Sequence, residues 1–503
     1  TIVSGLIFVK NPEKRKKSNR CLFIDSKTLT RHHGTTMRFP VFRKRSKAPS
    51  LAPEQHEHRR QKIETLKAGR LAALALSFTS DIIEKYGPRL AGSEASLHAA
   101  QEIRSSYEPF CDHSETESVD IDTSFHSFPL QLALYLYPAI LSLLLVGLPY
   151  LGLLLFLAYL WYAARTLYLY KPIGKLGKHS VEGMNVYAVL EPKQEVLHTL
   201  LFTSHHDSAP LFHYNRLDRI AYAKKVALPV LLFLLAGLFN ATHMITELLE
   251  GRLFAFSLPP IGMGVIGILL LGATPLLLPL RSFYSHEGSP GAGDNLASVG
   301  MTVQLARYFH WKKSCNTPLS HTRLIFCSFD GEESGLQGSK AWYEKHNAEL
   351  GGSLVLNFDS IYHADKLTFL ERDINGTQAL SYRLARRCVQ IAKSMGYEAV
   401  SESIPRLAGG TDAACASLAG LEATTLTSVA WDDRSKPSVY HTERDVVSAI
   451  DGKAVEMALS IAIRLVELVD SNRLWDVGEM PSPKEQEPEE GDPKLVFTKL
   501  THR

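Results

Sequence analysis

The sequence predicts a layered α/β domain with a mixed, mostly parallel sheet, interrupted by two inserted transmembrane helical hairpins. From about residue 185 to residue 470, short β-favouring apolar runs alternate with helical patterns, which is typical of strands joined by crossover helices. Two other regions, 128–170 and 226–280, are almost continuously apolar. Each holds two segments close to the length of about 20 residues that crosses a hydrocarbon core.

Composition limits the classes of protein that the chain can be. Its 55 Lys and Arg nearly balance 52 Asp and Glu, so we expect no nucleic-acid partner. The six cysteines are scattered, which predicts neither a disulfide framework nor a cysteine zinc site. Residues 1–36 precede a more natural-looking start at Met37 and are left out of the fold argument. We expect 1–60 to be a basic, disordered segment and 476–503 a disordered acidic, Pro-rich tail.

The polar segments supply the elements of the α/β domain in chain order. Apolar spacing predicts a helix that ends near residue 86, followed by a Gly-Pro turn and a second helix at 95–107. The expected strands are 118–122, 185–190, 197–203, 324–329, 353–359 and 423–428. The expected later helices are 294–309, 339–346, 379–395 and 454–469, the last of them amphipathic.

The apolar regions are expected to form hairpins rather than buried core helices. A Gly-Leu-Pro-Tyr break at 147–150 divides the first region, and charged residues around Gly251 divide the second. Because each pair crosses and returns, 37–127, 171–225 and 281–503 all lie on one side of the bilayer. The segments 61–127, 171–225 and 281–475 can then form one domain.

Charge predicts which side that is. The far-side turns hold one basic residue, Arg252, whereas the near side is strongly basic, which places the domain in the cytoplasm. On the opposite side of a eukaryotic membrane, Asn375 in Asn-Gly-Thr would be a glycosylation acceptor. The basic residues that flank the hairpins are Arg165, Lys171, Lys175, Lys178, Arg219, Lys224, Lys225 and Arg281.

Metal-capable side chains follow the ends of the predicted strands. Ser-His-His-Asp-Ser at 204–208 and Asn-Phe-Asp at 357–359 each end a strand, and a Glu-Glu pair at 332–333 follows another. Gly-Ala-Gly-Asp-Asn at 291–295 precedes a helix, and Tyr-His-Thr-Glu-Arg-Asp at 440–445 precedes the last one. Open α/β sheets hold their chemistry at the carboxyl edge of the strands. Two His and three carboxylates there suit two zinc ions that share one carboxylate.

Taken singly, these residues have simpler explanations. Asp294 is also a plausible helix N-cap, Asp359 a turn residue, His441 a surface loop residue and Glu332 one member of a solvated acidic pair. Those explanations do not account for all of them lying at strand ends of one domain. Nor do they account for Asp207, which stands two residues after His205 and can orient an imidazole.

The five motifs together resemble the co-catalytic zinc exopeptidases that include bacterial leucine aminopeptidases and glutamate carboxypeptidase. Gly-Pro-Arg-Leu-Ala-Gly-Ser at 87–93 is similar to that family's N-terminal signature. The resemblance covers about 85–127, 180–215 and 285–470. It implies a three-layer α/β/α sandwich around a mixed sheet. Unlike soluble members, this chain carries hairpins, one of them between His205 and Asp294, so the membrane must lie close to the catalytic mouth.

The resemblance also implies a role for each site residue. His205 and Asp359 would bind one zinc ion, Glu333 and His441 the other, and Asp294 would bridge them. Glu332 would be the general base and acid, and Asp207 would hydrogen-bond His205. Gly410 and Asp412 belong to a glycine-rich turn of the kind that this family places beside the substrate, although the turn is equally explained as a tight turn alone.

These expectations define a multi-pass membrane exopeptidase, an aminopeptidase that removes N-terminal residues from peptides. A di-zinc-bound hydroxide would attack, with Glu332 as its base. The alternatives are a carboxypeptidase of the same fold or a non-catalytic membrane receptor or scaffold. An aminoacyl cyclase is disfavoured, because those enzymes keep one zinc whereas five ligands are present here.

Overall fold

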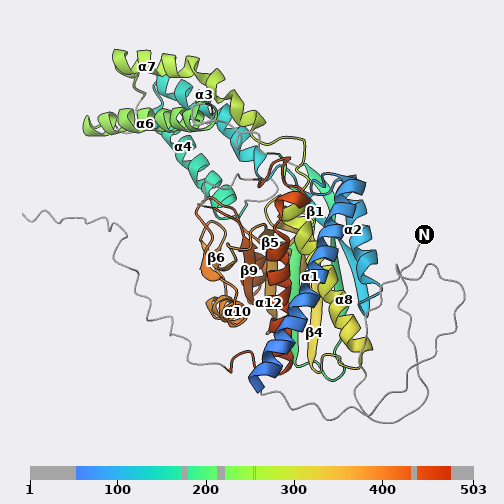
Figure 1. Ribbon diagram of the computed structural model, residues 1–503. Coiled ribbons are helices and arrows are strands. Elements are labelled where there is room, and N and C mark those ends of the chain that lie inside the picture. Colours follow the sequence, from blue (N-terminus) through green and yellow to red (C-terminus); the bar gives the residue numbers. More distant parts are fainter. Residues whose placement is uncertain are drawn as a thin grey trace, which may run out of the picture.

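The computed structural model describes residues 53–172, 179–211, 221, 223–252, 254, 256–431 and 439–476, with side chains from residue 68 onward. An α/β domain carries a separate group of helices at one end (Figure 1). The expected disorder of 1–52 and of 477–503 falls outside the described residues. The segment 53–60, expected to be disordered, is instead the first part of helix α1.

One nine-stranded mixed sheet forms the centre of the α/β domain. Its order is β1-β2-β4-β3-β5-β9-β6-β7, with β8 paired to β6. The central strands β4, β3, β5 and β9 are parallel, whereas β1, β2 and β7 pair antiparallel, as does β6 with β9. The sheet is therefore mixed as expected, but its parallel part is confined largely to the centre. The strands are β1 His113–Asp122, β2 Ser180–Leu190, β3 His198–His205, β4 Thr322–Phe329, β5 Leu354–Ile361, β6 Thr368–Asp373, β7 Gln378–Ala379, β8 Val400–Ser403 and β9 Glu422–Ser428.

Helices cover both faces of this sheet, which makes the domain an α/β sandwich. One core lies beneath α1, α2, α8, α10 and α12, and a second lies on the opposite face beneath α9 and α11. Apolar spacing explains α12, because its predicted face of Val455, Ala458 and Ile461 is buried. The helices are α1 Pro53–Tyr86, α2 Glu94–Tyr107, α8 Ala297–Ser314, α9 Gln337–His346, α10 Tyr382–Ser394, α11 Asp412–Leu418 and α12 Gly452–Asp470.

The two apolar regions form one helical bundle with its own core. The bundle consists of α3 Ser127–Leu145, α4 Pro149–Ala163, α6 Leu228–Leu249 and α7 Ile261–Gly272, with short helical extensions η2 Ala164–Tyr168, η4 Ala223–Ala227 and η5 Thr274–Ser282. Helix α3 packs against α4, α6 and α7. All four helices, with their extensions, are long and apolar enough to cross a membrane. Large apolar side chains cover the outside of the bundle; Leu154, Leu238, Ile261 and Leu269 are more than half exposed.

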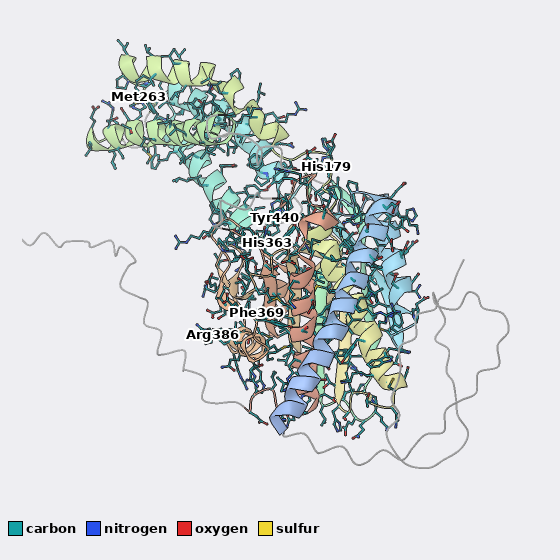
Figure 2. All side chains as sticks on the ribbon, in the orientation of Figure 1. His179, Met263, His363, Phe369, Arg386 and Tyr440 are labelled. Atoms are coloured by element: carbon teal, nitrogen blue, oxygen red, sulfur yellow. The ribbon has the colours of Figure 1, made fainter. Side chains whose placement is uncertain are left out.

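The bundle adjoins the end of the α/β domain where the metal-capable residues gather. Tyr440, beside His441, lies at the end of the domain nearest the bundle, whereas Arg386 on α10 lies toward the other end (Figure 2). The metal-capable residues and the candidate membrane spans are therefore neighbours, as the position of the inserted segments in the chain predicts.

Candidate metal centre

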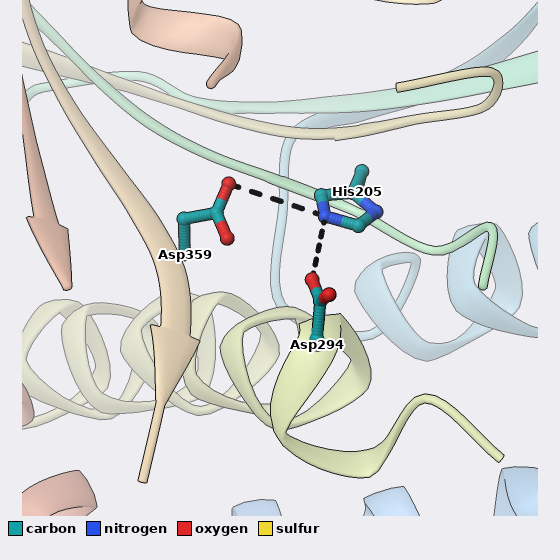
Figure 3. A group of neighbouring side chains, drawn as sticks. All are labelled: His205, Asp294 and Asp359. Atoms are coloured by element: carbon teal, nitrogen blue, oxygen red, sulfur yellow. Dashed lines mark ion pairs between the residues drawn. The ribbon is translucent and has the colours of Figure 1, made fainter. Parts of the chain in front are cut away.

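Five segments that are far apart in the chain bring the predicted ligands to one place. His205 is the last residue of β3, and Asp359 lies near the end of β5. Asp294 lies in η6 (Ala292–Leu296), directly before α8, and Glu333 follows β4. Figure 3 shows His205 between Asp294 and Asp359, which approach it from different elements. The parallel register of β3 with β4 and β5 brings these strand ends together.

The two carboxylate oxygens of Asp294 face two different imidazoles. Its Oδ1 lies 3.3 Å from Nε2 of His205, and its Oδ2 lies 3.1 Å from Nε2 of His441. Asp359 Oδ2 lies 4.0 Å from Nε2 of His205, and Glu333 Oε2 lies 3.4 Å from Nε2 of His441. Asp294 thus stands between two half-sites, each with one His and one further carboxylate.

This spacing fits metal ions. Zinc binds imidazole nitrogen and carboxylate oxygen at about 2.0–2.2 Å, so two ligand atoms on one tetrahedral ion lie about 3.3–3.5 Å apart. The His205, Asp294 and Asp359 ligand atoms lie within 4.8 Å of one another, and so do those of Asp294, Glu333 and His441. Asp294 Oδ2, Glu333 Oε1 and His441 Nε2 are also buried without a hydrogen-bond partner. Buried polar atoms rarely lack partners, and a bound cation would satisfy these three.

The electrostatics of the site also call for positive charge. Burial raises the pKa of Glu332 well above its usual value; His205 opposes that rise, and the Glu333 and Asp359 carboxylates add to it. Burial acts to lower the pKa of His441, but Glu333 and Asp294 raise it to about 10. The carboxylates therefore hold protons on their imidazole neighbours when no cation neutralises them, and metal binding would displace those protons.

Asp207 connects the two parts of the site. Its carboxylate lies 3.3 Å from Nδ1 of His205 and accepts hydrogen bonds from the backbone N–H groups of Glu332 and Glu333, at 3.3 and 3.1 Å. The side chain is fully buried. One carboxylate thus orients the His205 ring and holds the turn that carries both glutamates.

Asp445 and Arg89 support the site in ways that the sequence argument did not assign. Asp445 accepts hydrogen bonds from the backbone of Gly293 and Asp294, at 2.8 and 3.2 Å, and is fully buried. Arg89, also fully buried, donates from Nε to the carbonyl of His206 and from Nη1 to that of Gly87. Arg89 belongs to the motif at 87–93 and Asp445 to the motif at 440–445, so both motifs could have pointed to these residues.

The two predicted substrate residues occupy different environments. A cavity beside the ligands is lined by Asp294, Glu332, Asp359 and Gly410, so Gly410 lies at the cavity, and its contact with substrate stays a prediction. Asp412 begins α11, is fully buried and is not among the lining residues. Burial raises its pKa to about 7. Its carboxylate therefore lies beneath the site rather than at its surface.

Comparisons with known proteins agree with the resemblance. Residues 280–466 match the model of Peptidase family M28. No curated protein matches the chain at the sequence level.

Several solved structures are also similar. A Zn-dependent exopeptidase from Parabacteroides distasonis is 11% identical, with a TM-score of 0.46, over 78% of this chain and 97% of that one. The LapA aminopeptidase of Legionella pneumophila is 11% identical, with a TM-score of 0.46, over 85% of this chain and 78% of that one. A glutaminyl cyclase from an Acidobacteriales bacterium is 14% identical, with a TM-score of 0.46, over 80% of this chain and 95% of that one.

Proposed function

We propose that this chain, whose residues 280–466 match the model of Peptidase family M28, is a membrane-anchored, zinc-dependent exopeptidase and most specifically an aminopeptidase. One observation carries the proposal. The two oxygens of Asp294 face His205 and His441 at 3.3 and 3.1 Å inside a buried set of carboxylates. A solvated acidic cluster does not require one carboxylate between two imidazoles, whereas two metal ions that share one carboxylate do.

The ligand set suits two zinc ions. His205 and Asp359 would hold one ion, Glu333 and His441 the other, and Asp294 would contribute one oxygen to each. When bound, the ions supply Lewis-acid activation of water and of the scissile carbonyl. Asp207 keeps the His205 ring in place and, through two backbone N–H groups, keeps the two glutamates at the mouth of the cavity.

Glu332 is placed to move the proton. Its carboxylate lines the cavity, and its Oε2 lies 3.8 Å from Nε2 of His205, a looser approach than that of Asp294. A buried carboxyl with a raised pKa can accept a proton from the attacking water and still release it to the leaving amine. Because Glu333 faces His441, the adjacent glutamates have separate tasks.

The cavity lining favours a substrate with a free amino group. The charged residues among its described lining are the acids Asp294, Glu332 and Asp359. The described lining holds no Lys or Arg that would pair with a C-terminal carboxylate, which favours a substrate cleaved at its amino end. Leu370, Ile404, Ala408 and Trp431 complete an apolar side of the same cavity, so we propose a medium-sized apolar side chain at the cleaved residue.

The four apolar helices support a multi-pass anchor. Their length and composition are those of membrane spans, and we propose that they cross as two hairpins. The basic residues beside the spans then place the α/β domain on the cytoplasmic side. Cysteine labelling of Gly251→Cys in sealed vesicles tests this orientation in a background where Cys21, Cys111 and Cys315 are changed to Ser, because Cys111 is partly exposed whereas Cys327, Cys388 and Cys415 are buried. Labelling from the cytoplasmic side would reject it.

The test of activity compares the full chain with Glu332→Gln in detergent. Both proteins should bind two zinc ions, and only the wild type should release amine from unblocked aminoacyl p-nitroanilides. The variant's kcat should fall by about 10²–10⁴, the usual contribution of a general base. Cleavage of N-blocked peptides at their carboxyl ends would instead indicate a carboxypeptidase. Zinc binding without turnover of any peptide would contradict peptidase activity, and no zinc at all would leave a scaffold.

A further inference from the structure

Aromatic side chains gather where the chain passes between the α/β domain and the helical bundle. Phe125 and His126 directly precede α3, Tyr170 follows η2 and Tyr284 follows η5. Their ring centroids are 4.7 Å apart for Phe125 and His126, 5.6 Å for Phe125 and Tyr170, and 5.8 Å for His126 and Tyr284. Three separate crossings thus meet in one packed group, which we call the junction cluster.

Phe125 packs the junction cluster against the loop that carries Glu332. A Cβ atom on Gly335 would lie 2.6 Å from a carbon of the Phe125 ring, so the ring lies directly on the Gly335 backbone. Gly335 in turn donates its N–H to the carbonyl of Glu332 at 2.9 Å. Gly335 has a φ of +94°, a conformation that L side chains rarely adopt, so a larger residue is excluded there on two grounds. The start of α3 is therefore in contact with the proposed general-base loop.

Asn375 ties the end of η2 to the glycine-rich loop at the cavity. Its Nδ2 donates to the carbonyl of Tyr168 at 2.9 Å, and its Oδ1 accepts from the N–H of Gly409 at 3.0 Å. The backbone N–H of Asn375 also donates to the carbonyl of Gly409 at 2.7 Å. Tyr170 adds a contact to the same loop, because its Oη lies 3.4 Å from the position of a Cβ on Gly409.

This placement changes the interpretation of the Asn-Gly-Thr sequence at 375–377. Asn375 is 3% exposed, and its amide is engaged on both sides. A glycan attaches to Nδ2, which here faces the end of a bundle helix. In the folded chain this asparagine is a structural link, and its position beside Gly410 puts that link next to the cavity.

We propose that the junction cluster and Asn375 are positioning elements through which the bundle holds the Glu332 loop and the Gly409–Gly410 loop in place. The bundle would then be part of the catalytic apparatus as well as an anchor. Both loops contain glycines with positive φ, namely Gly335 and Gly409, so their own backbones restrain them weakly. The helical bundle supplies the rigidity that they lack. This inference rests on the proposed peptidase function.

The test measures loop mobility and kinetics in the full chain, made in a bacterial host that adds no N-linked glycan. Asn375→Ala removes the link entirely. Asn375→Asp keeps an oxygen that accepts from the Gly409 N–H. Its second oxygen faces the Tyr168 carbonyl, so only the hydrogen bond to the bundle is lost. Tyr170→Ala removes the ring, and Tyr170→Phe keeps it. The controls are Tyr135→Ala on the outer face of α3, where Tyr135 is 69% exposed, and the exposed Asn347→Ala after α9.

Loop mobility gives a result that does not depend on activity. Hydrogen exchange should become faster in the peptide covering 405–411 of the two Asn375 variants and in the peptides covering 331–336 and 405–411 of Tyr170→Ala. It should stay at the wild-type rate in 331–336 of Tyr170→Phe, which keeps the ring, and in both peptides of both controls. On unblocked aminoacyl p-nitroanilides, KM should rise about tenfold in the Asn375 variants, which loosen the Gly409–Gly410 loop, and kcat should fall about tenfold in Tyr170→Ala, which loosens the Glu332 loop. A fall in kcat with unchanged loop exchange would reflect a smaller folded fraction and would count against the positioning role.

The two hypotheses fail in different ways. Faster loop exchange in a chain that hydrolyses no peptide would retain the positioning role and reject the peptidase. Hydrolysis by the wild type, with loop exchange and KM in all the Asn375 and Tyr170 variants equal to those of the controls, would overturn the positioning role. Equal effects of Tyr135→Ala and Tyr170→Ala would overturn it too, because any disturbance of the bundle would then suffice.

Discussion

Asp207→Asn is the substitution that most directly tests how the centre is built. The wild-type carboxylate accepts the backbone N–H groups of Glu332 and Glu333 at 3.3 and 3.1 Å, one on each oxygen. It also lies 3.3 Å from Nδ1 of His205, whose hydrogen bond at 3.1 Å is to the backbone carbonyl of Asp207. An asparagine of the same shape offers one acceptor oxygen and one NH₂ group. One of the two backbone N–H groups must then face another donor, and the His205 ring keeps the carbonyl but loses a charged partner.

The magnitude follows from these contacts. Loss of a ligand-orienting carboxylate typically weakens metal binding 10–100-fold, which is about 1.4–2.8 kcal/mol. One buried N–H left without an acceptor costs about 1–3 kcal/mol of folding stability. Removal of a negative charge that acts on the buried Asp330 and Asp412 carboxylates offsets part of that cost in the metal-free protein. We therefore expect the main loss in the zinc-bound form.

Zinc titration and thermal unfolding, each with and without zinc, separate these contributions. Asp207→Asn should bind at least one zinc ion 10–100-fold more weakly than the wild type, and zinc should raise its unfolding temperature less. Asp476→Asn, an exposed change near the C-terminal end of the described chain, is the control. Wild-type zinc affinity with an unchanged zinc-dependent stabilisation would refute the role given to Asp207.

Three further predictions follow from other parts of the chain. Burial raises the pKa of Asp373 to about 6, so its ionisation opposes folding as pH rises from about 4 to about 6. In Asp373→Asn the new side-chain amide can accept from the Thr411 N–H and donate to the Thr411 hydroxyl, so both hydrogen bonds are kept. The substitution should therefore raise the free energy of unfolding by about 1–3 kcal/mol at pH 8 and change it little near pH 4. Equal changes at both pH values in urea unfolding would contradict this. In the bundle, a Cβ on Gly237 would lie 2.4 Å from the Phe156 ring, whereas a Cβ on Gly262 would meet no atom within 4 Å. Gly237→Leu should therefore destabilise the detergent-solubilised protein by about 1–3 kcal/mol, and Gly262→Leu should not. Equal melting curves for the two variants would refute the packing of α4 on α6. A chelator should abolish hydrolysis and lower the unfolding temperature, zinc should restore both, and unchanged activity after verified zinc removal would exclude a metallopeptidase.

Short and polar strands could not be predicted from the sequence. Strand β6 ends in Glu-Arg-Asp, and β8 is mostly exposed at the edge of the sheet, so neither has the apolar run that marked the central strands. The helix expected from residue 294 begins at Ala297, because Asp294 and Asn295 have non-helical backbone angles. Asp445 receives the N–H groups of Gly293 and Asp294 instead, a long-range pairing that local periodicity does not contain.

The sequence by itself determined the alternation of strands and helices, the four long apolar segments and the set of metal-capable motifs at strand ends. Those features are local, because side-chain period and motif spacing depend on neighbouring residues alone. Only the tertiary structure decided that Asp294 faces both His205 and His441, that Asp412 lies beneath the cavity, and that Asn375 joins a bundle helix to the Gly409–Gly410 loop. Each of these relations joins residues that are more than 30 positions apart or depends on the burial of a side chain by distant segments. They arise when separate segments pack together, and no single stretch of the chain encodes them.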